Sequence, residues 1–326
     1  MKNHHKLTFY LLILFFCFNL SGQTIIEKYQ PKKNDSIRIG KGEKDFFPYI
    51  EKGYTLMLPK SKKVKGVLIF LEDSKFDQKN NSAKQIYDVA SNAEFAVLSV
   101  STEIPLDFYF TRNSLLYADK MIKSIFNQHQ LPNKNIFFLG ASLVGHRAMQ
   151  YILFSQKTKL DSKLNIRGIV MCNFTLDFTR KWLQHERDIK LNRIDLWEPK
   201  FFNYMLETQL KGTPKNVPEN YHKVSSYSYF DNENRNIKYF KDYAIRAYIE
   251  PSIEYRLEKY HRTLYDNNTT DIIGFLAEVR LAGNKNTELI NLENNKKSTQ
   301  KTSQSSWNKL DKQELMGWIL ANSKID

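Results

Sequence analysis

The stretch Asn135-Ile-Phe-Phe-Leu-Gly140-Ala-Ser142-Leu-Val-Gly145-His-Arg-Ala-Met-Gln150 joins a strand pattern to a helix pattern through a tight turn. Apolar residues precede Gly140, and apolar side chains at three- and four-residue spacing follow Gly145. Ser142 therefore stands at the apex of a turn between a strand and a helix, the setting called a nucleophile elbow. The first amides of such a helix point to the place where negative charge develops during acyl transfer.

This stretch resembles the corresponding stretch of the α/β-hydrolase superfamily, with one departure. The usual pattern has Gly two residues after the Ser, whereas this chain has Val144 there and Gly145 one place later. At the level of pattern, the resemblance covers most of residues 50 to 322. It implies a mostly parallel, doubly wound sheet, with Ser142 as the nucleophile of an esterase or acyl-ester hydrolase.

Strands and helices alternate on both sides of the elbow, and this alternation by itself predicts an α/β fold with a parallel sheet. Continuous apolar runs suit strands that are buried on both faces. We expect strands at 54–58, 66–71, 95–100, 136–139, 166–172, 243–249 and 287–292, and helices at 82–93, 253–264, 270–281 and 310–320, with one more beginning near residue 114. Residues 51–326 should form one α/β-hydrolase-like domain.

The alternation stops between about residues 178 and 242, where aromatic residues crowd a charged segment with helical stretches. In α/β-hydrolase-like enzymes, an insertion above the carboxyl ends of the strands carries a cap or lid over the substrate. We therefore predict a cap insertion at about 178–242. The alternative is an aromatic-rich helical excursion that packs on the sheet.

The N-terminus has the pattern of a secretory signal peptide over residues 1–23: basic residues, then an apolar run from Leu7 to Leu20, then Ser21-Gly22-Gln23. We expect a periplasmic or secreted protein, with an uncleaved membrane anchor as the alternative. Residues 24–50 are polar and suggest an N-terminal arm. Without the leader only Cys172 remains, so no internal disulfide can form.

The net charge is +14, and the lysines that produce it are scattered along the chain. This pattern indicates a solvated basic surface that would favour anionic envelope polymers, and no nucleic-acid module is recognisable. No His, Cys or carboxylate cluster has the spacing of metal ligands, and no Gly-rich phosphate loop is present. We expect no metal and no other cofactor, a small-molecule ester or acyl substrate, and membrane contact only through the leader.

The resemblance also implies an oxyanion hole and an acid. The Leu143 N–H would supply one oxyanion donor, and the loop after the 66–71 strand, at Asp73, the other. The acid should follow the strand after the cap, where Glu250 stands. Glu254 and Asp177 are alternative acids, and each of the three carboxylates could instead cap a helix.

The histidine that should serve as the base is missing. No histidine follows His261, and the loop that should carry the base has the sequence Thr302-Ser-Gln-Ser-Ser306-Trp307. A His-Ser-Trp triplet would suit such a loop, which places Ser305 where the base belongs. A serine hydroxyl cannot act as a base near neutral pH.

Three hypotheses remain open at this point. Another histidine could serve as the base, and the candidates are His146, His185, His222 and His261. The protein could instead be a degenerate hydrolase that binds a ligand or polymer without cleaving it. It could also keep slow esterase activity from the oxyanion hole and Ser142, because some catalysis survives the loss of a triad member.

Overall fold

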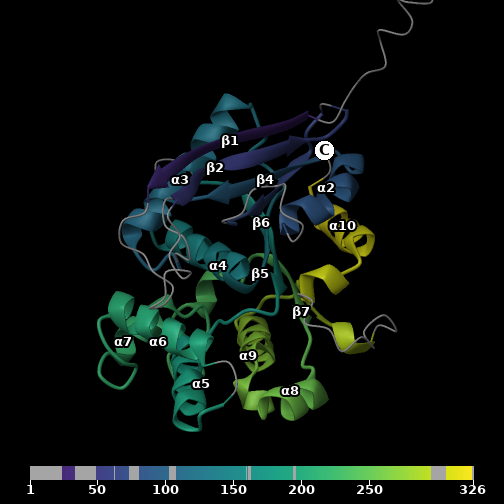
Figure 1. The fold of residues 1–326 in the computed structure, drawn as a ribbon. Coiled ribbons are helices and arrows are strands. Elements are labelled where there is room, and N and C mark those ends of the chain that lie inside the picture. The colour runs from purple at the N-terminus through teal and green to yellow at the C-terminus, as the bar shows by residue number, and fades with distance from the viewer. Residues whose placement is uncertain are drawn as a thin grey trace, which may run out of the picture.

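The computed structural model describes residues 24–33, 49–61, 63–72, 81–102, 108–158, 160, 163–193, 196–294 and 306–324. Its centre is an eight-stranded sheet with the strand order β1-β2-β4-β3-β5-β6-β7-β8 (Figure 1). The strands are β1 Thr24–Lys33, β2 Tyr49–Leu58, β3 Gly66–Phe70, β4 Phe95–Ser101, β5 Ile136–Ala141, β6 Ile166–Cys172, β7 Ala244–Ile249 and β8 Thr287–Asn291.

Six neighbouring strands, from β4 to β8, run parallel, whereas β1 and β2 are antiparallel to their neighbours. The predicted α/β fold with a mostly parallel sheet is thus confirmed. One detail differs: the first part of the segment that we expected as an N-terminal arm is strand β1, at the edge of the sheet. Strand β1 pairs with β2 over its whole length. The polar sequence of β1 does not predict this pairing.

Helices cover both faces of the sheet, because alternate residues of each central strand point to opposite sides. On β5, Ile136 and Phe138 belong to the apolar core beneath one layer of helices, and Phe137 and Leu139 to the core beneath the other. The first layer contains α3 Arg112–Gln128, α4 Ser142–Lys157 and α9 Asn268–Leu281, and the second contains α2 Ser82–Asn92 and α10 Lys312–Ala321.

The insertion between β6 and β7 lies beyond the carboxyl ends of the parallel strands, in the lower part of Figure 1. It contains α5 Phe178–Lys190, α6 Trp197–Leu210 and α7 Pro218–Val224, and α8 Ile253–Tyr260 follows β7 in the same region. Short 3₁₀ turns lie at Ile237–Tyr239, Leu264–Asp266, Leu292–Asn294 and Ser306–Lys309. Within the described residues, no helix has the length and apolar character that crossing a membrane requires.

The insertion has an apolar cluster of its own, to which Phe178, Trp182 and Leu206 belong. Its first helix is also tied to α9, because the buried Asp271 accepts hydrogen bonds from the Arg180 guanidinium, at 2.8 Å for Nη2 and Oδ2. These contacts fix α5 beside the carboxyl ends of β6 and β7, where parallel α/β proteins place their sites.

Candidate active site

Ser142 lies at the junction of β5 and α4 with a backbone φ of 51°, in the left-handed region. A serine rarely adopts this conformation, and the strain persists only where the surrounding structure imposes it. Here β5 ends at Ala141 and α4 begins at Ser142, so the reversal from strand to helix falls on one residue. The Ser142 side chain is exposed at the apex.

Two glycines allow this sharp junction. A Cβ atom on Gly140 would come within 2.4 Å of the Gly145 nitrogen, so the end of β5 and the first turn of α4 touch backbone to backbone. A Cβ atom on Gly145 would come within 2.3 Å of the Phe174 ring. Gly145 is thus the residue of this turn that has no room for a side chain, whereas Val144 packs, partly buried, against the apolar core beneath α2 and α10.

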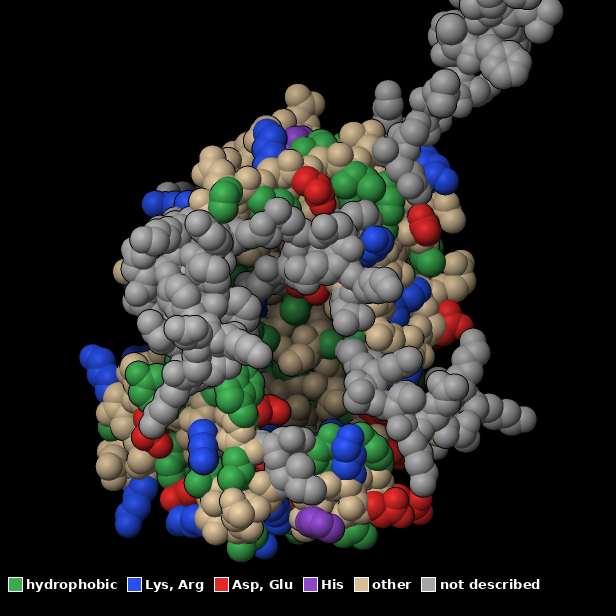
Figure 2. Space-filling model, viewed as in Figure 1, with side chains coloured by type: hydrophobic (Ala, Val, Ile, Leu, Met, Phe, Trp, Pro, Cys, Tyr) green, Lys and Arg blue, Asp and Glu red, His purple; other side chains and the backbone are tan. Residues whose placement is uncertain are grey.

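Ser142 opens into a cavity of about 460 Å³ at the carboxyl ends of β5, β6 and β7, a volume in the range of ligand pockets. Figure 2 shows a hollow in this face of the molecule, between the sheet and the helices beyond the strand ends. The lining is mostly polar and charged: Ala141, Ser142, Cys172, Asn173, Lys181, Gln184, Glu198, Glu250, Ser252, Tyr255, Arg256, Tyr260, Arg262, Asp266, Asn268 and Ser306.

Of the three predicted acids, only Glu250 lines this cavity. Glu250 directly follows β7, and its residue is 7% exposed. Asp177 instead caps α5: its carboxylate accepts from the Arg180 N–H at 3.0 Å and the Tyr229 N–H at 2.8 Å. Burial, and then the charge of Asp271, raise the pKa of Asp177 to about 6. Glu254 is exposed in the first turn of α8.

Glu250 already has a cationic partner, the ammonium group of Lys309, which hydrogen-bonds to its Oε1. Lys309 belongs to the 3₁₀ turn Ser306–Lys309, directly after the loop in which the sequence predicts the base. Ser306 lines the cavity, and its Oγ lies 3.1 Å from Nδ2 of Asn173, which donates to it. Ser305 itself lies outside the described residues. The chain thus places a lysine ammonium beside the acid that would otherwise orient an imidazole.

His146 faces away from this cavity although it is only four residues from Ser142. Its Nε2–H donates to the Phe108 carbonyl oxygen at 2.9 Å, and its ring packs edge-on against Phe178, with centroids 4.6 Å apart. Burial is the main cause that lowers the pKa of His146 to about 3. The imidazole is therefore held neutral in an aromatic environment beneath the insertion.

The other described histidines also lie elsewhere. His185 is buried, donates to Oδ1 of Asn203 at 3.3 Å, and has a pKa that burial lowers. His222 lies in α7 beside Glu219, and His261 is exposed after α8. His129 directly follows α3 and hydrogen-bonds to the hydroxyl of Tyr54 in β2 at 3.0 Å. None of these four, nor His146, is among the residues that line the Ser142 cavity.

Leu143 is the second residue of α4, so its N–H is one of the four that have no partner within the helix. This is the N–H that the sequence predicts as an oxyanion donor, and the Leu143 side chain packs against the apolar cluster of the insertion. Asp73 lies outside the described residues. The preceding Glu72 is buried, and its Oε1 accepts from the Ser82 N–H at 3.2 Å, which directs this carboxylate oxygen toward α2.

Sequence reasoning missed Lys181, which lines the same cavity as Ser142. Burial is the main cause that lowers its pKa to about 8, and the Glu198 carboxylate at 4.0 Å acts in the opposite direction. An amine with a pKa near 8 is partly unprotonated in neutral solution, and lysine serves as the base in some serine hydrolases. The only sequence signal is its place, one turn after the Asp177 cap of α5.

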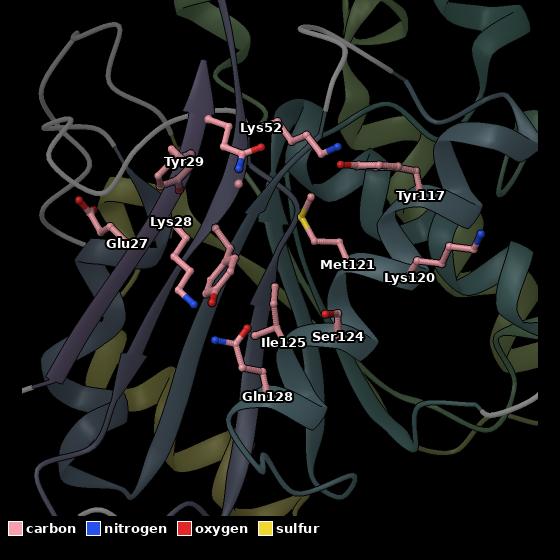
Figure 3. Close-up of a pocket in the computed structure, with 13 residues that line it drawn as sticks. Glu27, Lys28, Tyr29, Lys52, Tyr117, Lys120, Met121, Ser124, Ile125 and Gln128 are labelled. Atoms are coloured by element: carbon pink, nitrogen blue, oxygen red, sulfur yellow. The ribbon is translucent and has the colours of Figure 1, made fainter. Parts of the chain in front are cut away.

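A second cavity, of about 660 Å³, lies on the other side of the molecule between β1, β2 and α3 (Figure 3). Lys52 and Tyr117 face each other across it, with Nζ 4.3 Å from the ring centre. It contains neither Ser142 nor Glu250, so the smaller cavity is the candidate active site. No group of three or more His, Cys, Asp or Glu side chains that could hold a metal is found in the part of the chain that the structure describes.

No protein-family model and no curated protein matches the sequence. Among solved structures, the chain is similar to an acylaminoacyl peptidase of Pyrococcus horikoshii (13% identity, TM-score 0.50), over 86% of this chain and 38% of that one. It is also similar to carboxyl esterase 2 of Tuber melanosporum (11%, TM-score 0.51) and to a thermostable esterase of Pseudomonas putida (10%, TM-score 0.54). Each of these matches covers 94% of this chain and 86% of the esterase. The chain thus spans less than half of the peptidase and most of the length of the esterases.

Proposed function

We propose that this chain, which has the α/β-hydrolase fold, is an exported serine hydrolase of the esterase or acyl-ester class with Ser142 as its nucleophile. The observation that carries the proposal is the elbow: an exposed serine with a φ of 51° at the first turn of a helix, opening into a cavity that also contains Glu250. Such a serine lies where the helix amides can stabilise an oxyanion.

In this proposal Ser142 attacks the ester carbonyl, and the Leu143 N–H donates to the developing oxyanion. The loop at Asp73 is the place for the second donor. Lys181, in its neutral form, accepts the proton of the Ser142 hydroxyl and returns it to the leaving alcohol. Glu250 holds the ammonium group of Lys309 at the end of β7. The substrates are small esters or acyl compounds.

The first experiment is labelling of the mature protein with a fluorophosphonate probe, which reacts with activated serines. We expect labelling of the wild type and none of Ser142→Ala. Ser252→Ala is the matched control, because Ser252 lines the same cavity and also has a left-handed backbone, with a φ of 49°. Labelling that persists in Ser142→Ala, or that is absent from a folded wild type, contradicts an active nucleophile at this position.

The same probe tests the base. If Lys181 accepts the proton, the labelling rate rises with pH around the lysine pKa of about 8, and Lys181→Met labels slowly at every pH. Conversely, a Lys181→Met protein that labels as fast as the wild type rules Lys181 out.

A second candidate function is a degenerate hydrolase that binds a ligand or an envelope polymer without cleaving it. Two observations favour it: no histidine of the described residues lines the cavity, and Lys309 is hydrogen-bonded to Glu250. The absence of labelling from a folded wild type would support this candidate.

Export is part of the proposal and rests on the signal-peptide pattern of residues 1–23. N-terminal sequencing of the protein from the periplasm or medium would give a chain that begins near residue 24. An uncleaved chain in the membrane fraction would instead support an anchor.

A further inference from the structure

The charges that line the Ser142 cavity are nearly all paired. Among the residues that the structure describes, three cations and three carboxylates line it: Lys181, Arg256 and Arg262, and Glu198, Glu250 and Asp266. Arg262 donates to the buried Asp188 at 2.6 Å, Asp266 lies 3.3 Å from Arg193, Glu250 holds Lys309, and Lys181 lies 4.0 Å from Glu198.

Arg256 is the exception. Its guanidinium forms no hydrogen bond and no ion pair with any described residue, and its Nε is buried without a partner. The pKa of Arg256 is lowered, first by burial and then by the positive charge of Arg262, while the charges of Glu250 and Glu198 act in the opposite direction. These carboxylates act only through their charge, and a partly desolvated guanidinium beside a second arginine is unfavourable until an anion hydrogen-bonds to it.

Arg256 lies within the candidate active site. Arg256 lies in α8, which begins three residues after Glu250, and it lines the same cavity as Ser142. The neighbouring residues Ile253 and Leu257 of α8 are exposed. A ligand whose carbonyl reached Ser142 could extend, within one cavity, toward an arginine that forms no hydrogen bond with any described residue.

We propose that Arg256 binds a carboxylate group of the substrate, so that the cavity selects acyl or ester compounds that carry one negative charge. This inference rests on the proposed function, since it assigns the substrate class of the same site. A planar guanidinium matches a carboxylate through two parallel hydrogen bonds. A doubly charged phosphate fits less well, because Glu198, Glu250 and Asp266 line the cavity too.

Binding of two anilides, measured by titration calorimetry on the mature protein, tests the proposal without requiring catalysis. Glutaranilic acid carries a carboxylate at the end of a five-carbon acyl chain, and pentananilide has a methyl group in its place. We expect the wild type to bind glutaranilic acid about tenfold more tightly, the scale of a charge-assisted hydrogen-bonded pair. Arg256→Gln should bind both compounds equally, and Arg256→Lys should keep part of the preference.

Arg187→Gln is the matched control, because Arg187 is an exposed arginine of α5 that does not line the cavity. It should keep the full preference. Equal binding of the two anilides by the wild type overturns the proposal, as does no binding of either, or a preference that survives in Arg256→Gln. If Arg256→Gln does not fold, Arg256→Lys decides the matter, because a full wild-type preference in Arg256→Lys also overturns the proposal. Fluorophosphonate labelling of Ser142 reports separately on the proposed function, so each inference can fail alone.

Discussion

The pair of Glu250 and Lys309 gives the sharpest test of how this site is built. The Glu250 side chain is 9% exposed and that of Lys309 is 15% exposed, so neither group is well solvated. Changing Glu250 to Gln removes the charge and leaves the Lys309 ammonium facing a neutral amide. Breaking a fully buried pair costs roughly 3–5 kcal/mol, and the partial exposure at the cavity wall reduces this to about 2 kcal/mol.

The assay is urea unfolding of the wild type, Glu250→Gln, Lys309→Gln and the double variant. We expect each single change to lower the free energy of unfolding by about 2 kcal/mol, and the double variant to lose less than the sum, with a coupling of about 1–2 kcal/mol. Glu254→Gln is the control, because Glu254 is an exposed carboxylate four residues away. It should change stability by less than about 0.5 kcal/mol.

Two results would refute this reasoning. One is a Glu250→Gln variant as stable as the wild type, which would mean that the pair is not formed in solution. The other is a double variant whose loss equals the sum of the single losses, which would mean that the two groups do not interact. In either case Glu250 would be free to orient a base.

Two further predictions concern the elbow and the buried imidazole. Gly145→Ala should lower the free energy of unfolding by about 1–3 kcal/mol, because the added Cβ would lie 2.3 Å from the Phe174 ring. Gly317→Ala is the control and should not lower it, because a Cβ there meets nothing within 4 Å. The pKa of His146 is about 3 in the folded protein and about 6.5 when the chain is unfolded. Between these two pH values the imidazole binds a proton mainly in the unfolded chain, so protonation favours unfolding as the pH falls through this range. From pH 6.5 to pH 4 the wild type should lose about 3 kcal/mol more than His146→Gln in urea unfolding. If the wild type and His146→Gln lose stability in parallel over this pH range, the burial argument is contradicted.

Most of the fold could be predicted because it is specified locally. A run such as Gly66–Phe70 is buried on both faces, and that burial is visible in the sequence as continuous apolar residues. The elbow is also local, since Gly140, Ser142 and Gly145 lie within one turn of chain. Strand β1 was not predicted as a strand, because its polar residues pair with β2 at an edge, where burial leaves little pattern.

The site itself depends on partners that are far apart in the sequence. Glu250 and Lys309 are separated by 59 positions, and the local sequence around either residue does not predict their pairing. Asp177 and Glu250 both follow strands, yet one caps a helix and the other lines the cavity. Likewise, the neutral state of His146 and the lowered pKa of Lys181 arise from burial beneath or beside the insertion.

The sequence by itself therefore determined the parallel sheet, the serine at its turn and the absence of a histidine after His261. The first two follow from local patterns of residues, and the third is read directly from the chain. Only the tertiary structure decided which carboxylate and which cations share a cavity with Ser142. Side-chain pairing and desolvation depend on which distant segments pack together, and hydrophobic periodicity reports only that a residue is buried, not which group it meets.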